Sequence, residues 1–409
     1  IKNIKHNNGK VGQFGTSYPG FYTAVGTLAQ HPALVASSPQ APISDFWNDD
    51  FMHNGRFMLG YFKTFPVFGV QKTKPEDKAW YMDSFIKQTS EDGLKFYRDL
   101  GTLKDAYEKY YKNNFFMTEI MNHTNYDEFW QKRNLLPHLK NINHAVMTVG
   151  GWFDAEDLSG PLNIYKTIEK TSPKAKNTIV MGPFSHGAWS YEQGKHFHNQ
   201  IYFGDSIATY YQKNIETKFF NHYLKENSKN EVALPEAYMF DTGKKEWKEF
   251  SNWPPKNSDK LNLYLDSDGK IKNEKPNITA YSEYYSDPNK PVPSSINYSD
   301  MNGFTPRNYM SEDQRFALNR PDVLTFTTEY LTEDVTLAGE IMAKLKIEST
   351  SSDADFIVKI IDIYPPDEPQ NKDKPTVLYA NYHQMVRSEI MPARFRSSFE
   401  IPVALIPNT

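Results

Sequence analysis

The chain has 409 residues and a formal net charge of −4, so its length predicts two or three domains and its charge gives no basic surface for nucleic acid. It contains no cysteine, which excludes disulfides, thiolate catalysis and cysteine-based zinc sites. No stretch approaches the roughly 18 unbroken apolar residues of a membrane span, so we expect a soluble globular protein without membrane or nucleic-acid partners.

The first feature in chain order is a sharp turn at residues 15–20, which read Gly-Thr-Ser-Tyr-Pro-Gly. The apolar residues before it predict the end of a strand, and the stretch from Tyr22 to Ala29 predicts a helix. Such a corner holds the hydroxyl of Ser17 clear of the backbone, where a base and a substrate carbonyl can reach it. The second glycine comes one residue later than in the strict Gly-x-Ser-x-Gly pattern, and Pro19 is tolerated because a missing N–H costs little in the first helical turn.

This turn lies close to the start of the chain at Ile1. In an α/β-hydrolase several strands precede the nucleophile, and one of their loops supplies an oxyanion donor. We therefore expect the chain to be part of a longer one, with those strands and that donor before residue 1. A signal peptide is compatible with this expectation.

The segment after the turn divides into a short strand and a long helical block. Residues Ala33 to Ser37 predict a buried strand. Between Phe51 and Leu139 the pattern changes to polar helical segments with many aromatic residues, such as Leu103 to Tyr111 and Asn125 to Arg133. We expect this block to be a cap over an active site, and we attribute the aromatic content of 15% mainly to aromatic cores.

Two further strands end in motifs that hold acid and base side chains. The strand from His144 to Gly150 leads to Asp154 in Gly-Gly-Trp-Phe-Asp, and the strand from Thr178 to Met181 leads to His186 in Gly-Pro-Phe-Ser-His. In open α/β sheets, ligands bind at the carboxyl ends of the strands. The order serine, acid, histidine is typical of α/β-hydrolases and differs from the order in both major serine protease families.

Taken singly, Ser17 could be a turn serine, Asp154 a helix N-cap and His186 a loop histidine. Their shared position after strands favours a catalytic triad instead. In this triad His186 takes the proton of Ser17 as general base, and Asp154 fixes the imidazole tautomer and stabilises the imidazolium. The backbone N–H of Tyr18, the residue after the nucleophile, is the expected oxyanion donor.

A second group of carboxylates accompanies the triad. Glu156 and Asp157 follow Asp154 closely, and Asp49 and Asp50 form another acidic pair downstream of the serine. Acids in a first helical turn are also favoured by the helix dipole, which is a structural alternative for the first two. If one residue of the other pair joins them in a pocket, their repulsion calls for a cation, and a substrate ammonium would serve.

The rest of the chain predicts one more helix and an all-β region. Residues Ser206 to Leu224 carry apolar and aromatic side chains at helical spacing, and we expect the hydrolase part to end there. From Val232 onward, short runs rich in β-branched and aromatic residues alternate with turn residues, which is typical of a sandwich or jelly roll. The strand candidates are Leu261 to Leu265, Val323 to Thr327, Ile341 to Ile347 and Phe356 to Ile363.

Together these elements predict the α/β class, as an α/β-hydrolase with an inserted helical cap and a C-terminal all-β jelly-roll domain. We place the hydrolase domain at residues 1–51 and 141–228, the cap at 52–140 and the jelly roll at 229–409. The jelly roll is expected to shape the pocket or an oligomer interface rather than to perform chemistry.

Two other motifs allow alternative interpretations. His196-Phe197-His198 has a spacing compatible with two metal ligands, but no partner motif surrounds it and we favour a surface loop. Asp353-Ala354-Asp355 is compatible with calcium, and a turn at the start of a strand is the better interpretation. We therefore predict no metal site.

Several of these segments together resemble the α-amino-acid ester hydrolases. That group includes cocaine esterase, X-Pro dipeptidyl-peptidase and proteins labelled glutaryl-7-aminocephalosporanic acid acylase. The resemblance covers nearly the whole chain and implies the same hydrolase, cap and jelly-roll architecture. It rests on the serine turn, His31-Pro32-Ala33-Leu34, Asp49-Asp50, Gly-Gly-Trp-Phe-Asp-Ala-Glu-Asp, Gly-Pro-Phe-Ser-His-Gly and the segment from Ser352 to Pro365.

The resemblance implies the same triad as the spacing. It further implies that Asp50, Glu156 and Asp157 hold the α-ammonium of the substrate. Asp49 is the fallback, because this chain is one residue shorter between the serine turn and the acidic pair. The family's oxyanion tyrosine would lie before residue 1, and a periplasmic or secreted location is implied by the family alone.

We therefore predict a serine hydrolase that forms an acyl-enzyme from esters or amides of α-amino acids, without a cofactor. Its partners would be small esters, amides or short peptides, and a homo-oligomer is compatible with the sequence. A carboxylate cluster would repel an anionic glutaryl group. The nearest rivals are an X-Pro dipeptidyl-peptidase, which also needs an ammonium anchor, and a general carboxylesterase or acylase. A rival of another class is a non-catalytic protein whose aromatic-rich sandwich binds carbohydrate.

Overall fold

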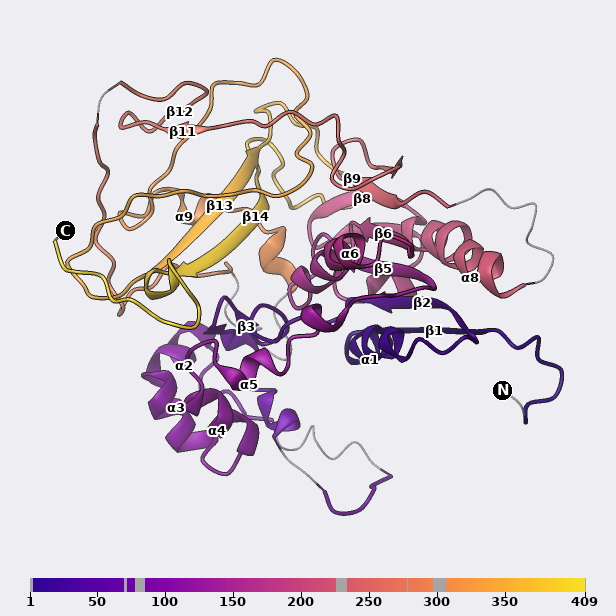
Figure 1. The fold of residues 1–409 in the computed structure, drawn as a ribbon. Coiled ribbons are helices and arrows are strands. Elements are labelled where there is room, and N and C mark those ends of the chain that lie inside the picture. Colours follow the sequence, from indigo (N-terminus) through magenta and orange to yellow (C-terminus); the bar gives the residue numbers. More distant parts are fainter. Residues whose placement is uncertain are drawn as a thin grey trace.

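The computed structural model describes residues 3–69, 72–77, 85–225, 234–277, 279–296 and 307–408. These residues form a central sheet with helices on both faces, a helical region and a β-rich C-terminal region. Figure 1 shows the helical region and the C-terminal strands next to each other, beside the central sheet. The architecture is that of an α/β-hydrolase with a β-rich C-terminal region, as the sequence predicts.

The central sheet has six strands in the order β1-β2-β5-β6-β9-β10. Neighbouring strands run parallel except β10, which pairs antiparallel with β9. All residues of β5 are buried, as expected for a parallel strand covered on both faces. The strands are β1 (Val11–Thr16), β2 (Leu34–Gln40), β5 (Ala145–Gly151), β6 (Lys176–Gly182), β9 (Ala237–Asp241) and β10 (Glu246–Phe250).

Helices cover both faces of this sheet. They are α1 (Tyr18–Gly26), α6 (Ser159–Thr171), α7 (Ile207–Tyr210), the π-helix η7 (Tyr211–Glu216) and α8 (Thr217–Leu224). Val146 of β5 packs with α1 and α6 on one face, whereas its neighbour Met147 packs with η7 and α8 on the other. This alternation follows from the two-residue period of a strand.

The helical predictions for these segments hold with two refinements. Helix α1 begins at Tyr18, earlier than expected, with a proline in its first turn, and a short 3₁₀ turn, η1 (Thr27–Ala29), follows it. The predicted helix over residues 206–224 is helical from Ile207 onward, but its middle is the π-helix η7. At the end of η7, Glu216 accepts a hydrogen bond of 2.7 Å from Gln40, which ties this helix to β2.

The central sheet continues past residue 224, where we expect the hydrolase part to end. Strand β9 pairs with β6, with Ala237 opposite Ile179, and β10 continues the sheet beyond it. The pairing partner of β9 is more than 50 residues away in the chain, so local composition does not reveal that β9 belongs to this sheet. The predicted boundary at 228/229 itself lies outside the described residues.

The helical region is built around an aromatic core. Phe51, Phe62, Phe65 and Trp130 are fully buried there, in keeping with the interpretation of the aromatic content. The predicted helix over residues 103–111 is confirmed as α3. The elements are β3 (Met52–His53), β4 (Arg56–Phe57), η2 (Leu59–Tyr61), η3 (Phe65–Phe68), α2 (Gly93–Asp99), α3 (Leu103–Tyr110), α4 (Phe115–Asn122), α5 (Glu128–Gln131) and η5 (Leu136–His138).

The predicted helix over residues 125–133 is wrong in length, because only the four residues of α5 are α-helical. Tyr126 donates a hydrogen bond of 2.7 Å to the Asp45 carboxylate, and Asn134 donates one of 3.0 Å to the same carboxylate. These long-range bonds hold the segments on both sides of α5 outside a helix. None of the helices in the described ranges is long and apolar enough to cross a membrane.

The C-terminal region contains two hairpins within the described residues, β11 with β12 and β13 with β14. The predicted strand over residues 356–363 is confirmed as part of β13. The remaining elements of the C-terminal region are β11 (Tyr264–Leu265), β12 (Ile271–Lys272), η9 (Arg307–Met310), α9 (Arg315–Leu318), β13 (Asp355–Ile363), β14 (His383–Pro392) and η10 (Ala393–Phe395). Between β6 and α7 lie η6 (Ala188–Ser190), β7 (Lys195–His198) and β8 (Ile201–Asp205).

Two strands predicted for this region do not form in the described residues. The described residues also show no pair of sheets packed face to face, as a jelly roll would have. Residues 341–347 form no strand, and residues 323–327 contribute only a single bridge between Thr327 and Lys270. Leu324 and Ile341 are exposed in these runs. A β-branched run becomes a strand only where a partner strand takes up its backbone hydrogen bonds.

The helical and C-terminal regions are joined by apolar and ionic contacts. Trp47 packs edge-on against Phe395 and Phe399, with ring centroids 5.5 and 6.0 Å away. Arg56 at β4 donates hydrogen bonds of 2.9 Å from Nε to both carboxyl oxygens of Asp355 at the start of β13. The segment after β2 that carries Trp47 is therefore fixed from both sides.

Gly20 offers a test of how α1 is held against β2. A Cβ at Gly20 would lie 2.2 Å from the carbonyl oxygen of Gln40. We expect Gly20→Ala to lower the free energy of unfolding by about 1–3 kcal/mol, because overpacking forces a backbone shift. Urea denaturation measures this change.

The matched control is Gly243→Ala, whose Cβ would meet Asp241 at an ordinary 3.5 Å. This variant should change the free energy of unfolding by less than about 0.5 kcal/mol. Equal losses in the two variants would show that the close approach at Gly20 is not what matters.

Candidate active site

Ser17 stands at the corner between β1 and α1 in a strained backbone conformation. Its φ of 68° and ψ of −128° lie in a region that residues with a side chain rarely adopt. The strain is supported by close packing, since a Cβ at Gly15 would lie 2.5 Å from the carbonyl oxygen of Pro19. The N–H of Ser17 donates a 2.9 Å hydrogen bond to the carbonyl of Gln40, which fixes the corner to the end of β2.

The two glycines of this turn are each required by a different close contact. Gly15 makes room for Pro19, whereas Gly20 makes room for the carbonyl of Gln40 on the neighbouring strand. The second glycine is therefore needed at the position that faces β2, and in this chain that position is three residues after Ser17. The departure from the strict motif spacing leaves the strand-to-helix corner intact.

Tyr18 is the first residue of α1, so its N–H has no acceptor within the helix and points out of the helix start. This position suits an oxyanion donor, and that role stays a prediction. Its side chain lies near the acidic residues: burial, followed by the charges of Asp50 and Asp157, raises the pKa of the Tyr18 hydroxyl far above its ordinary value. The serine turn and the carboxylates thus belong to one site.

Asp154 and His186 contact each other directly after β5 and β6. Nδ1 of His186 lies 2.9 Å from Oδ2 and 3.1 Å from Oδ1 of Asp154. Oδ1 of Asp154 also accepts the N–H groups of Glu156 and Asp157, at 2.9 and 3.0 Å. Asp154 therefore caps the turn that follows it and orients the imidazole as well, so both sequence interpretations of this residue apply.

Charge stabilises this pair. Although burial alone would raise the pKa of Asp154, the facing imidazole and the two backbone N–H groups bring it below its usual range. Burial works against a charged His186, but Asp154, Glu156 and Asp50 together raise the pKa of its imidazole to about 9. At neutral pH the ligand-free site therefore favours an Asp154 carboxylate beside an imidazolium.

The histidine loop lies against the serine turn. Gly187 has a left-handed φ of 71°, and a Cβ on it would approach Cγ2 of Thr16 to 3.3 Å. Nε2 of His186 is buried and has no hydrogen-bond partner in the described ranges, so it is not bonded to the Ser17 hydroxyl. Catalytic hydrogen bonds often tighten only in the substrate complex. The proton transfer between Ser17 and His186 stays a prediction.

Asp50, Glu156 and Asp157 meet beside this imidazole. The N–H of Asp50 donates to Oδ1 of Asp157 at 3.1 Å and to the carbonyl of Glu156 at 3.0 Å. Oε2 of Glu156 lies 3.7 Å from Nε2 of His186. All three acids are buried. They precede α6, which begins at Ser159, so the helix-dipole explanation for Glu156 and Asp157 does not apply.

Asp49, the fallback member, is turned away into the backbone. Its carboxylate accepts four hydrogen bonds: from the N–H and hydroxyl of Ser44 at 2.9 Å each, from the N–H of Asp45 at 3.2 Å and from the N–H of Gly160 at 2.8 Å. Burial raises its pKa to about 7 in spite of these donors. Asp49 is a structural residue, and Asp50 is the member of the pair that faces Glu156 and His186.

Ionisation of all the acids in the cluster of Asp50, Glu156 and Asp157 is energetically unfavourable when no cation is bound. Burial and then the charge of Glu156 raise the pKa of Asp50 to about 7, and burial and the charge of Asp50 raise that of Asp157 well above its usual range. Tyr61 of η2 hydrogen-bonds to Asp50 and lowers its pKa again. The sequence does not indicate Tyr61 as a site residue, because no motif distinguishes it from the other buried tyrosines.

The remaining motifs are structural. His196 and His198 are buried in β7, so the expected surface loop is wrong. Nε2 of His196 lies 2.7 Å from the carbonyl oxygen of Pro183, which steadies the loop that carries His186. Asp353 and Asp355 form ion pairs with Arg56. No cluster of potential metal ligands occurs in the described part of the chain.

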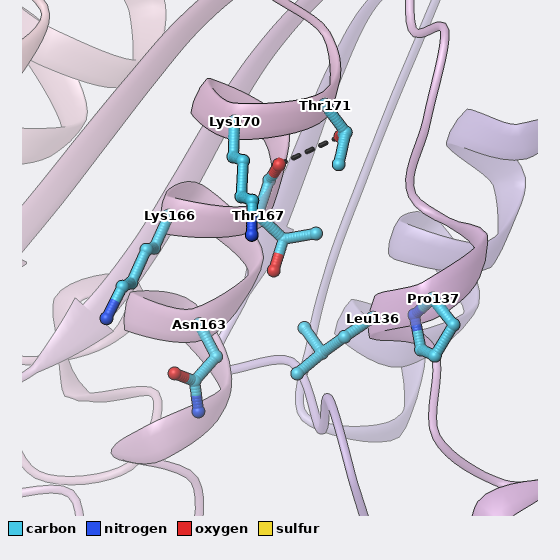
Figure 2. A pocket seen from close by; sticks show the side chains of 7 residues that line it. All are labelled: Leu136, Pro137, Asn163, Lys166, Thr167, Lys170 and Thr171. Atoms are coloured by element: carbon cyan, nitrogen blue, oxygen red, sulfur yellow. Dashed lines mark hydrogen bonds between the residues drawn. The ribbon is translucent and has the colours of Figure 1, made fainter.

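A surface hollow between α6 and η5 lies apart from this chemistry. Figure 2 shows the lysines of α6, Lys166 and Lys170, on one side and Leu136 and Pro137 of η5 on the other. None of the triad or cluster residues lines it, and Lys166 is paired with Glu340. The candidate site is therefore the group of buried side chains at the ends of β1, β2, β5 and β6.

The contact between Asp154 and His186 leads to a specific expectation. Asp154→Asn should keep the two N–H bonds of the turn but present an amide to the imidazole and favour the wrong tautomer, so kcat should fall about 10⁴-fold. Steady-state kinetics with an activated ester measures this, and circular dichroism checks that the fold is kept. A loss below about tenfold would argue against Asp154 as the triad acid.

Two family models match the chain. The model described as X-Pro dipeptidyl-peptidase (S15 family) matches residues 1–188, which hold the triad candidates. The model described as X-Pro dipeptidyl-peptidase C-terminal non-catalytic domain matches residues 230–409. The two models together match the region that holds the triad candidates and the β-rich C-terminal region.

Known proteins agree with this assignment. The chain is 24% identical to cocaine esterase of Rhodococcus sp. (strain MB1 Bresler) over 88% of this chain and 63% of that protein. It is 23% identical to Xaa-Pro dipeptidyl-peptidase of Ligilactobacillus salivarius over 87% of this chain and 40% of that protein. The chain thus spans less than two thirds of the length of either relative.

Two solved structures resemble the whole chain. An aminopeptidase from a marine sediment archaeon, Thaumarchaeota archaeon, matches with a TM-score of 0.87 and 29% identity. An α-amino acid ester hydrolase matches with a TM-score of 0.85 and 28% identity. Each match covers 100% of this chain and 66% of the other. The chain therefore belongs to the S15 family of X-Pro dipeptidyl-peptidases and related serine hydrolases, which includes cocaine esterase.

Proposed function

We propose that the protein hydrolyses esters or amides of α-amino acids through an acyl-enzyme, and that Asp50, Glu156 and Asp157 bind the free α-ammonium of the substrate. The observation that carries this proposal is the burial of these three acids beside the triad. Carboxylates this close and this poorly hydrated repel one another, and a cation held between them relieves the repulsion.

The hydrogen bonding of the Asp50 carboxyl group is also compatible with a cationic ligand. Asp50 is buried, and the side-chain hydrogen bond to its carboxyl group comes from the hydroxyl of Tyr61. Buried carboxylate oxygens are normally satisfied, and an ammonium has three N–H donors to offer. An anionic acyl group such as glutaryl would instead add a further negative charge, which disfavours that substrate.

The proposed reaction uses the triad in two stages. The hydroxyl of Ser17 attacks the substrate carbonyl as His186 takes its proton, and the N–H of Tyr18 stabilises the oxyanion. His186 then protonates the leaving alcohol or amine. Water, activated in the same way, hydrolyses the acyl-enzyme and frees the amino acid. The ammonium anchor places the carbonyl next to Ser17 in both stages.

The X-Pro dipeptidyl-peptidase reaction is the second candidate, since the two family models and one relative carry that name. A dipeptidyl-peptidase also binds a free ammonium, but at a distance of two residues from the cleaved bond. In this chain Glu156 approaches the base itself, to 3.7 Å. This short distance favours an ammonium on the α-carbon next to the reacting carbonyl.

Comparing substrates tests the choice. We expect phenylglycine methyl ester to be cleaved with a higher kcat/KM than both Ala-Pro anilide and N-acetylphenylglycine methyl ester. Faster cleavage of the anilide would favour the peptidase. Faster cleavage of the acetylated ester would refute the ammonium proposal.

Asp50 and Asp49 provide a paired test of the binding site. Asp50→Asn should raise the KM for phenylglycine methyl ester about tenfold to a hundredfold, because it removes one charged partner of the ammonium. It should leave the KM for the acetylated ester unchanged. Asp49→Asn should instead destabilise the fold by about 2–3 kcal/mol, because an amide cannot satisfy all its N–H donors.

Steady-state kinetics and urea denaturation of both variants measure these effects. A KM effect that is the same for both esters would remove Asp50 from ammonium binding. Labelling with a fluorophosphonate separates an enzyme from a carbohydrate-binding protein. We expect an adduct on Ser17 that is lost in His186→Ala. No adduct on the full-length protein would favour the carbohydrate-binding protein.

A further inference from the structure

Glu156 faces the nitrogen of His186 that has to receive the serine proton. Its Oε2 lies 3.7 Å from Nε2, whereas Asp154 holds the opposite nitrogen, Nδ1, at 2.9 Å. Nε2 is buried and makes no hydrogen bond to any described residue. A neutral imidazole with its proton on Nδ1 leaves Nε2 free to act as base, but a carboxylate beside Nε2 favours the cationic form that is protonated on both nitrogens.

We propose that Glu156 couples recognition of the substrate ammonium to activation of the general base. In the free enzyme its carboxylate stabilises a proton on Nε2 of His186. When a substrate ammonium pairs with Glu156, this negative charge is neutralised and the proton leaves Nε2 for bulk water. His186 is then neutral and can accept the proton of Ser17. The inference rests on the ammonium site proposed above.

Within the described ranges, the charged groups that act on this imidazole come from two segments. Asp154, Glu156 and Asp157 follow β5, and Oδ2 of Asp157 lies 3.9 Å from Nδ1. Asp50 follows β2 and also acts on the His186 imidazole. Asp154, Glu156 and Asp50 together favour the imidazolium and raise its pKa to about 9. Among the acids of the described residues, Glu156 is the one placed at Nε2, so its neutralisation bears most directly on the base.

Specificity then acts on the chemical step as well as on binding. An ester without an ammonium can still bind at the active site, but it leaves His186 protonated at neutral pH. The kcat for this ester is therefore low. Its kcat should rise as the pH increases through about 9, where the imidazolium loses its proton. For an ammonium ester the same rise should occur at lower pH, because the cation has already released that proton.

A pair of ligands of equal shape tests this coupling directly. Betaine methyl ester carries a permanent trimethylammonium group, and methyl 3,3-dimethylbutanoate carries a neutral tert-butyl group in its place. Both can be added to the Ser17→Ala variant, which cannot hydrolyse them. The protonation of His186 is followed by NMR of the protein labelled in its histidines, with the signal assigned by its loss in His186→Asn. The same titrations give the affinity of each ligand.

We expect the cationic ester to bind more tightly and to raise the acid dissociation constant of the His186 imidazolium about tenfold or more, and the neutral ester to leave it unchanged. Tighter binding of the cation with no change at His186 would overturn the coupling and leave the proposed function intact. Equal binding of both esters would overturn the proposed function and the coupling with it.

Glu156→Gln gives the independent arm of the test. Without ligand, this variant should already show an acid dissociation constant for His186 about tenfold higher than the parent, since the charge at Nε2 is gone. The matched control is Glu128→Gln, whose side chain is exposed on α5 and paired with Lys132. It should leave His186 unchanged. An equal constant in parent and Glu156→Gln would refute the role of Glu156.

Discussion

The site depends on the burial of four carboxylates around one imidazole. Buried charges are costly unless they are paired, and here Asp154, Glu156 and Asp157 all lie within 4 Å of the one imidazole of His186. The fold supports this arrangement with backbone N–H donors and with packing from the helical region. In the proposed function, a cationic substrate relieves the repulsion between these buried acids. Substrate selectivity and chemistry are therefore linked.

The serine turn is the second place where the fold carries strain. The positive φ of Ser17 is held by the hydrogen bond from its N–H to Gln40 and by two glycines that admit close backbone contacts. Gln40 contributes further through its side chain, which accepts a 2.8 Å hydrogen bond from Trp189 near the histidine loop and donates to Glu216. One residue at the end of β2 thus links the nucleophile, the base loop and the π-helix.

Several features could be predicted because they depend on local order. The serine corner, the strands before Asp154 and His186, and α3 each follow from short patterns of glycine, apolar or capping residues. The extra strands β9 and β10, the short α5 and the unpaired runs at residues 323–327 and 341–347 could not, because partners far along the chain decide them. Local patterns also misplaced His196 and His198, which are polar residues on a buried strand.

The sequence by itself determined the order of serine, acid and histidine, the strand ends that carry them and the presence of two acidic pairs. Only the tertiary structure decided which acids meet: it directed the Asp49 carboxylate to backbone N–H groups, placed Asp50 against Asp157 and set Glu156 beside Nε2. The physical reason is that neighbouring residues in a turn point in different directions. The direction of Asp49 is fixed by its hydrogen bonds to Ser44 and to Gly160, which is 111 residues away in the chain.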